Sequence, residues 1–101
     1  MKAPQSSTAQ LFLADTYYVL SNFDEAILSY QKAILADEKN KDAHYGLGIT
    51  YVALAQIYSK KRPTTKVNIS KVADFKKKAR NQHEILSELD RVLADKLLPK
   101  L

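Results

Sequence analysis

The feature that most constrains the fold of this 101-residue chain is an internal repeat with a period of 34 residues. Six positions in the first part of the sequence carry the same residue, or one of similar size, 34 positions later. They are Ala9, Leu13, Ala14, Thr16, Tyr17 and Leu20, matched by Ala43, Leu47, Gly48, Thr50, Tyr51 and Leu54. Helix-turn-helix repeats have this period, and each unit buries its apolar face only by stacking on a neighbour. The sequence therefore predicts an all-α fold of stacked helical hairpins, about four helices forming a single domain over residues 1–101.

Capping signals and the spacing of apolar residues place three helices before residue 60. Ser7 opens an S-x-x-Q pattern, which predicts a capping box and a helix over about 7–20. Asn22, with a glutamate three residues later, predicts a second helix over about 24–36. A polar turn then leads to a third helix over about 41–59.

The third helix contains both glycines, and the rest of the chain predicts one long helix. Each glycine costs about 1 kcal/mol of helix propensity relative to alanine, so at least one of Gly46 and Gly48 is expected to permit a close approach between helices. Residues 60–68 contain a proline and no periodicity, which predicts a loop. Leucines spaced by threes and fours then predict a helix over 69–97, which is longer than the other three.

Residues 7–40 also carry a set of small and aromatic positions that form a complete repeat. They are Leu13, Ala14, Tyr17, Ala26, Tyr30 and Ala33, with the run Asp24 to Ile27. Within the second, irregular repeat, 41–98, only the first helix fits, through Leu47, Gly48 and Tyr51. On these residues, the segment 7–59 resembles the tetratricopeptide repeat family.

This resemblance implies a non-catalytic adaptor for protein–protein interaction, in which the first helices of stacked pairs line a groove for a partner peptide or helix. Carried over by register, the groove residues are Leu11, Asp15, Tyr18, Tyr45, Ile49 and Val52. The alternative is that the long last helix covers this face, or that the face mediates self-association. The family's carboxylate clamp for chaperone tails is not expected, because Leu11, Asp15 and Gly46 stand at its first three positions.

The leucine-rich end of the chain predicts a homo-oligomer. Repeat arrays usually need about three units for stability, and two units with an overhanging helix leave apolar surface exposed. The residues predicted to mediate self-association are Leu86, Leu89, Leu93 and Leu97.

Charge is unevenly distributed along the chain, whose net charge is +5. Residues 1–59 carry four lysines against six acids, whereas the segment from 60 to 80 carries nine basic residues against Asp74 alone. This basic patch consists of Lys60, Lys61, Arg62, Lys66, Lys71, Lys76, Lys77, Lys78 and Arg80. It supports an alternative function as a binder of nucleic acid or of an acidic surface. Nucleic acid is disfavoured, because lysine outnumbers arginine and Phe75 is the one aromatic residue in the patch.

No group of residues predicts catalysis, a metal or a cofactor. The chain has no cysteine, and its histidines are His44 and His83. His83 begins an H-E-x-x pattern, but Ser87 stands where the second metal ligand is required. With no apolar run long enough for a membrane helix or a signal peptide, we expect a cytoplasmic protein without a membrane span.

Overall fold

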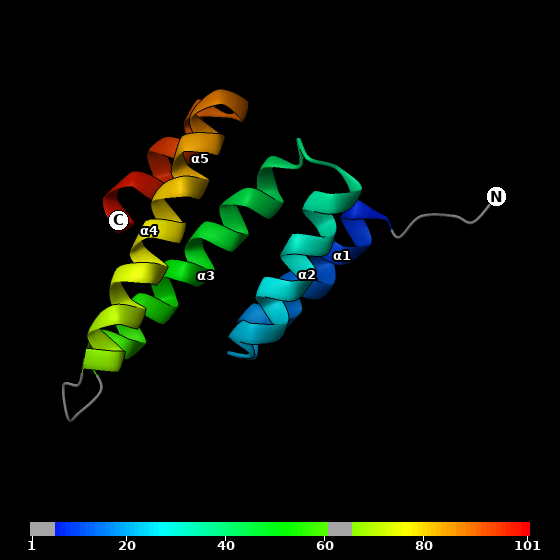
Figure 1. Cartoon of the computed structure of the whole chain (residues 1–101). Helices are drawn as coiled ribbons and strands as arrows, with labels where there is room; N and C mark the ends of the chain where they lie inside the picture. Colours follow the sequence, from blue (N-terminus) through cyan, green and yellow to red (C-terminus); the bar gives the residue numbers. More distant parts are fainter. Residues whose placement is uncertain (1–5, 61–65) are drawn as a thin grey trace.

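The computed structural model describes residues 6–60 and 66–101 of the chain. Those ranges contain five α-helices and a short 3-10 helix, and no strand (Figure 1). In chain order they are α1 (Ser7–Val19), α2 (Phe23–Ala36), α3 (Lys41–Ser59), α4 (Lys66–Leu89), α5 (Arg91–Leu97) and η1 (Leu98–Lys100). Figure 1 shows α3 between the α1–α2 hairpin and the α4–α5 pair. The predicted all-α fold of helical hairpins is confirmed.

The period of 34 residues reappears in the caps of α1 and α3. The Ser6 hydroxyl accepts a hydrogen bond from the Ala9 N–H at 3.3 Å, and the Asn40 side chain accepts one from the Ala43 N–H at 3.1 Å. A side-chain acceptor at this position satisfies a backbone donor that the helix itself leaves unpaired. The cap of α1 is therefore Ser6, one residue before the predicted Ser7.

Ser7 joins helices instead of capping one. Its hydroxyl donates to the carbonyl oxygen of Ala33, near the end of α2, at 2.8 Å. The Asn40 amide nitrogen in turn donates to the Ser7 hydroxyl oxygen at 2.7 Å. Since Asn40 also caps α3, the Ser7 and Asn40 side chains together connect the start of α1, the end of α2 and the start of α3.

The core consists of small residues where helices cross and larger side chains between the crossings. Its buried apolar residues are Ala14, Ala26, Tyr30, Ala33, Ala43, Leu47, Tyr51, Val52, Leu54, Ala55, Ala79, Leu86, Ala94 and Leu97. All six repeat positions on α3 are buried: Ala43, Leu47, Gly48, Thr50, Tyr51 and Leu54. Of their counterparts on α1, Ala14 is buried and Tyr17 is half-buried, whereas Ala9, Leu13, Thr16 and Leu20 are exposed.

Both glycines of α3 permit close approaches, as expected from their cost in a helix. A Cβ atom at Gly46 would lie 2.4 Å from two ring carbons of Tyr30. A Cβ atom at Gly48 would lie 2.8 Å from a methyl carbon of Leu97. Gly46 thus lets α2 approach α3, and Gly48 lets α5 do so from the other side.

The prediction of a single helix over 69–97 is wrong, because the chain turns at Asp90. Helix α4 begins earlier, at Lys66, and ends at Leu89. Residues 61–65 of the predicted loop 60–68 lie outside the described residues, and 66–68 form the first turn of α4.

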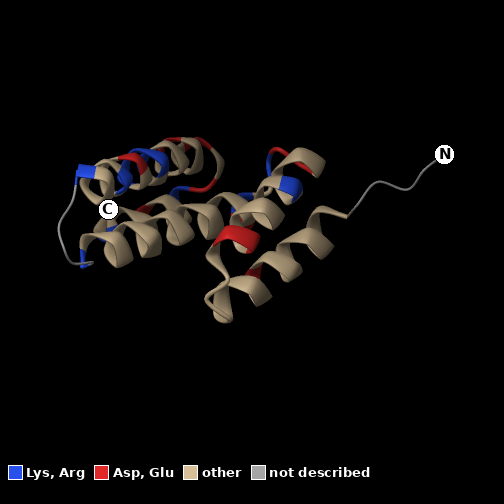
Figure 2. Ribbon diagram, turned by 60° about the horizontal axis from the view of Figure 1, so that its bottom comes forward, with Lys and Arg blue, Asp and Glu red and all other residues tan. Residues whose placement is uncertain are grey.

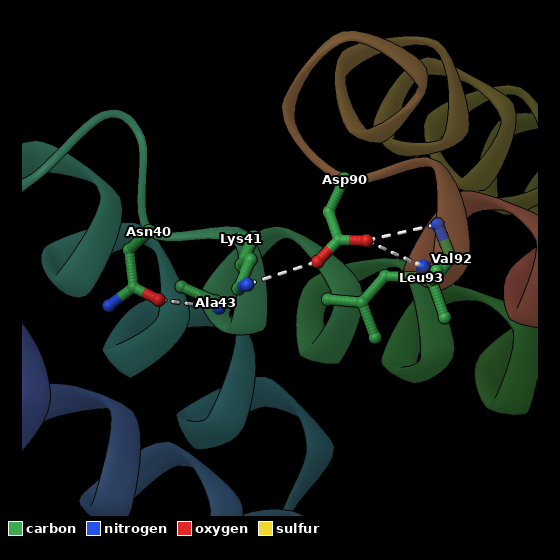
Figure 3. A network of polar contacts seen from close by, with 6 residues as sticks. All are labelled: Asn40, Lys41, Ala43, Asp90, Val92 and Leu93. Atoms are coloured by element: carbon green, nitrogen blue, oxygen red, sulfur yellow. Dashed lines mark hydrogen bonds and ion pairs between the residues drawn. The ribbon is translucent and has the colours of Figure 1, made fainter.

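Asp90 causes the break by capping α5 (Figure 3). Its backbone is extended, with φ −157° and ψ 103°. Its carboxylate accepts hydrogen bonds from the Val92 and Leu93 N–H groups at 2.9 and 3.2 Å, and forms an ion pair with Lys41 at 3.1 Å. Aspartate is favoured as an N-cap and disfavoured inside helices. The turn therefore folds α5 back onto α3 and α4, and the last helix does not overhang.

Candidate partner-binding groove

The six predicted groove residues lie on the two first helices of the hairpins, α1 and α3. Four of them, Leu11, Tyr18, Tyr45 and Ile49, are half-buried. Val52 is buried, and Asp15 is exposed. A half-buried side chain packs through one edge and offers the other to solvent, so this face retains apolar surface for a ligand.

A hollow of about 360 Å³ lies on this face and brings three of the six residues together. Its lining residues are Tyr18, Ile49, Val52, Ala53, Gln56, Pro99 and Lys100. The ring of Tyr18 is held edge-on against Phe23, with centroids 5.5 Å apart and planes at 61°. The start of α2 therefore fixes the orientation of the aromatic side chain that α1 contributes to the hollow.

The other three predicted groove residues have structural contacts. Leu11 and Tyr45 pack against the buried core. The Asp15 carboxylate accepts a hydrogen bond from the hydroxyl of Tyr30. Burial first, and this contact with Asp15 second, raise the pKa of Tyr30. Asp15 therefore stabilises the α1–α2 packing from the edge of the groove face.

The basic patch is divided by its contacts into different groups. Figure 2 shows Lys and Arg gathered along α4, whereas α1 carries none. Lys61 and Arg62 lie outside the described residues. Lys71 lies over the ring of Tyr58, 4.8 Å from its centroid, and Lys78 forms an ion pair with Asp74 at 3.1 Å. The remaining members are exposed: Lys60, Lys66, Lys76, Lys77 and Arg80.

An aromatic stack explains why Lys71 and Lys78 turn toward α3. The ring of Phe75 on α4 stacks on Tyr51 and Tyr58 of α3, with centroids 6.3 and 5.7 Å apart. Lys78 also lies 5.8 Å from the Tyr51 ring centroid. These two lysines cover the aromatic contact between α3 and α4. They therefore contribute to helix packing as well as to the charged surface.

A second hollow, of about 240 Å³, lies where α3, α4 and the C-terminal turn meet. Its lining residues are Val52, Ala55, Gln56, Ser59, Lys76, Ala79, Arg80, Lys100 and Leu101. No sequence pattern indicated Lys100, because that residue reaches the hollow only after the chain turns at Asp90. The spacing of Lys76 and Arg80, one helical turn apart, is the part of this site that a sequence pattern could indicate.

The leucines predicted to mediate self-association do not form an exposed surface. Leu86 and Leu97 are fully buried within the chain itself. Leu93 packs against the same core, and Leu89 is half-buried. Their spacing indicated an apolar stripe correctly, but the fold-back of α5 turns that stripe inward.

His44 is a buried residue, which the sequence did not indicate. One ring nitrogen lies 2.7 Å from the Gln82 side chain of α4, and the other lies 2.8 Å from the carbonyl oxygen of Glu38. His44 thus links α3 to α4 and to the preceding turn. Across residues 6–60 and 66–101, no three His, Asp or Glu side chains are grouped as metal ligands, and no helix is long and apolar enough to cross a bilayer.

Comparisons with known proteins agree with the repeat architecture. Residues 14–59 match a family model described as a TPR repeat. Two Arabidopsis thaliana proteins, Protein KINESIN LIGHT CHAIN-RELATED 2 and Protein KINESIN LIGHT CHAIN-RELATED 3, are each 41% identical to the chain over 49 residues, or 48% of its length. The match covers 7% of the first relative and 8% of the second, so the chain spans less than a tenth of these curated relatives. No solved structure matches the chain significantly.

Proposed function

Because residues 14–59 belong to the tetratricopeptide repeat family, we propose that the chain binds a peptide or helix of a partner protein along the face of α1 and α3. Tetratricopeptide repeats are typically non-catalytic interaction modules. The chain is accordingly a protein-interaction module, and the partner lies across the hollow lined by Tyr18, Ile49 and Val52.

The observation that carries this proposal is the half-exposed aromatic and aliphatic surface of the hollow. Tyr18 is positioned by Phe23, so little side-chain freedom is lost when a ligand packs on its ring. Tyrosine is enriched among the residues that dominate binding energy. Ile49 and Val52 lie one turn apart on α3 and supply the apolar floor of the hollow.

The test is selection of displayed peptides of about 12 residues on the immobilised chain, followed by affinity measurements on the recovered peptides. We expect Tyr18→Ala to weaken binding about 30-fold, because removal of a central aromatic side chain costs about 2 kcal/mol of binding free energy. The control is Val92→Ala, which truncates an exposed apolar side chain on α5 and leaves the affinity unchanged. Circular dichroism establishes that both variants are folded. Failure to recover any peptide, or equal affinities for both variants, would refute the proposal.

Self-association is a second proposal, now through a different surface. The α1–α2 hairpin carries large apolar side chains that are exposed, with Phe12 65%, Val19 79% and Leu35 84% exposed. A second copy, or a further repeat, packed there would bury them. Light scattering coupled to size exclusion tests this: the dimer that we expect becomes a monomer in Phe12→Glu/Leu35→Glu. A monomeric unsubstituted chain at high micromolar concentration contradicts it.

A further inference from the structure

We propose that the hollow between α3, α4 and the C-terminal turn binds an acidic side chain of the partner peptide. This inference rests on the proposed function and names the chemistry of its ligand. An apolar residue of the partner lies on Tyr18 and Ile49, and an Asp or Glu side chain of the same peptide enters the hollow lined by Lys76, Arg80 and Lys100.

The charged side chains that line the hollow all have the same sign and are surrounded by apolar walls. They come from two elements, Lys76 and Arg80 from α4 and Lys100 from η1, and among the described residues no acidic side chain lines the hollow. The walls between them include Val52 and Ala79. Cations on low-dielectric walls attract an anion more strongly than the same cations fully surrounded by water.

Among the described residues, no ion pair neutralises these three cations. In the described ranges 6–60 and 66–101, the ion pairs join Lys41 to Asp90 and Lys78 to Asp74. The α4 lysine that faces the aromatic stack thus has an acidic partner, whereas the cations of the hollow have none. Their mutual repulsion decreases when a carboxylate binds between them, and this favours an acidic ligand.

The hollow continues directly from the groove. Both hollows are lined by Val52, Gln56 and Lys100, so a peptide that lies along the groove reaches the cations without leaving the surface. A volume of about 240 Å³ is below the roughly 300–1,000 Å³ of pockets for drug-sized molecules. A single side chain of a larger ligand fits better than an independent small molecule.

The fold holds the cations in place from both sides. Ala79, which lies between Lys76 and Arg80 in the sequence, is buried against the core and fixes the rotation of α4. Lys100 follows Leu97, a fully buried anchor at the end of α5. The fold-back at Asp90 therefore places Lys100 opposite α4. The three cations thus lie on α4 and η1, and not on α1 or α3, the first helices of the two hairpins.

The experiment uses the peptides selected on the unsubstituted chain. We expect Asp or Glu at a fixed distance from an apolar residue to be enriched among them. The variant Lys76→Glu/Arg80→Glu should bind the best peptide about tenfold or more weakly, because a favourable charge contact becomes repulsive. Replacing the peptide's acidic residue by lysine should restore binding to this variant. The control Lys66→Glu/Lys77→Glu changes the net charge by the same amount outside the hollow and should change affinity little.

The outcomes separate this inference from the proposed function. Peptides without acidic enrichment, whose affinity falls in Tyr18→Ala but not in Lys76→Glu/Arg80→Glu, overturn the acidic site and leave the groove intact. If the selection recovers no peptide at all, that result counts against both the acidic site and the proposed peptide-binding groove. Oligothymidylate of about 20 nucleotides is the competitor for nucleic acid. If it binds the unsubstituted chain more tightly than the best peptide does, and its affinity falls in Lys76→Glu/Arg80→Glu, phosphate is the preferred ligand and the acidic-peptide site is wrong.

Discussion

For the substitution Gly46→Ala, helix propensity predicts an increase in the free energy of unfolding, whereas core packing predicts a decrease. In an isolated helix, alanine is more favourable than glycine by about 1 kcal/mol. In this fold, the new Cβ atom would meet two Tyr30 ring carbons at 2.4 Å and the Tyr30 hydroxyl oxygen at 2.7 Å. The ring is 2% exposed, and its hydroxyl donates to Asp15, so it cannot move away without losing core contacts.

The magnitude follows from these two effects. Overpacking a core by one methyl group costs about 1–3 kcal/mol, and loss of the Tyr30–Asp15 hydrogen bond adds about 1 kcal/mol. After the gain in propensity, we expect Gly46→Ala to reduce the free energy of unfolding by about 1–3 kcal/mol. In a domain of this size, that lowers the melting temperature by about 4–24 °C.

A double-mutant cycle with Tyr30→Leu isolates the clash. Leucine lacks the two ring carbons and the hydroxyl oxygen that the new methyl group would meet, so Gly46→Ala in the Tyr30→Leu background should stabilise by about 1 kcal/mol. The coupling between the two sites is then about 2–4 kcal/mol, measured by urea unfolding of the four proteins. Stabilisation by Gly46→Ala alone, or equal effects in both backgrounds, would refute the packing explanation.

Three further predictions concern polar contacts. Asn40→Ala should lower the free energy of unfolding by about 1–2 kcal/mol in urea titrations. Asn40→Asp keeps the helix cap and loses only the hydrogen bond donated to Ser7, so it should lower the free energy of unfolding by less. Equal losses in the two variants would contradict this. The hydrogen bond from the Lys41 ammonium, and then the Leu93 N–H, lower the pKa of Asp90, so its contribution is present above the ordinary aspartate pKa of about 3.9 and is lost as pH falls through the lowered value. Asp90→Asn, which retains an N-cap, should flatten the acid decline in thermal melts below about pH 4. Because burial raises the pKa of Tyr30 above its ordinary value, folding opposes ionisation of its hydroxyl; stability should fall above about pH 10, and less steeply in Tyr30→Phe when urea midpoints are compared.

The first three helices were predictable because their signals are local. The caps, the polar turns and the apolar spacing all lie within a few residues of each boundary, and α3 has the predicted bounds. The break at Asp90 was not recognised, although aspartate is a strong cap. Leucines keep a helical spacing on both sides of the break, because both helices face the same core, so periodicity alone does not distinguish one helix from two.

The candidate site was predictable only as far as it lies on α1 and α3. Register placed Tyr18, Ile49 and Val52 on one face, and the structure has all three in one hollow. The contribution of Lys100 depends on the return of the chain after α5, which no local pattern encodes. For the same reason, the sequence did not indicate that Leu97 is buried against Gly48.

The two walls of the groove differ in how strongly the fold holds them. Helix α1 contributes two buried residues, Gln10 and Ala14, whereas α3 contributes nine. Amide hydrogens in weakly buried elements exchange with solvent through local opening, while those of a central helix exchange through global unfolding. Deuterium uptake should therefore be faster in α1 than in α3. A ligand bound on Tyr18 would hold α1 closed. Binding should therefore slow amide exchange strongly in α1 and only slightly in α3, which is already rigid.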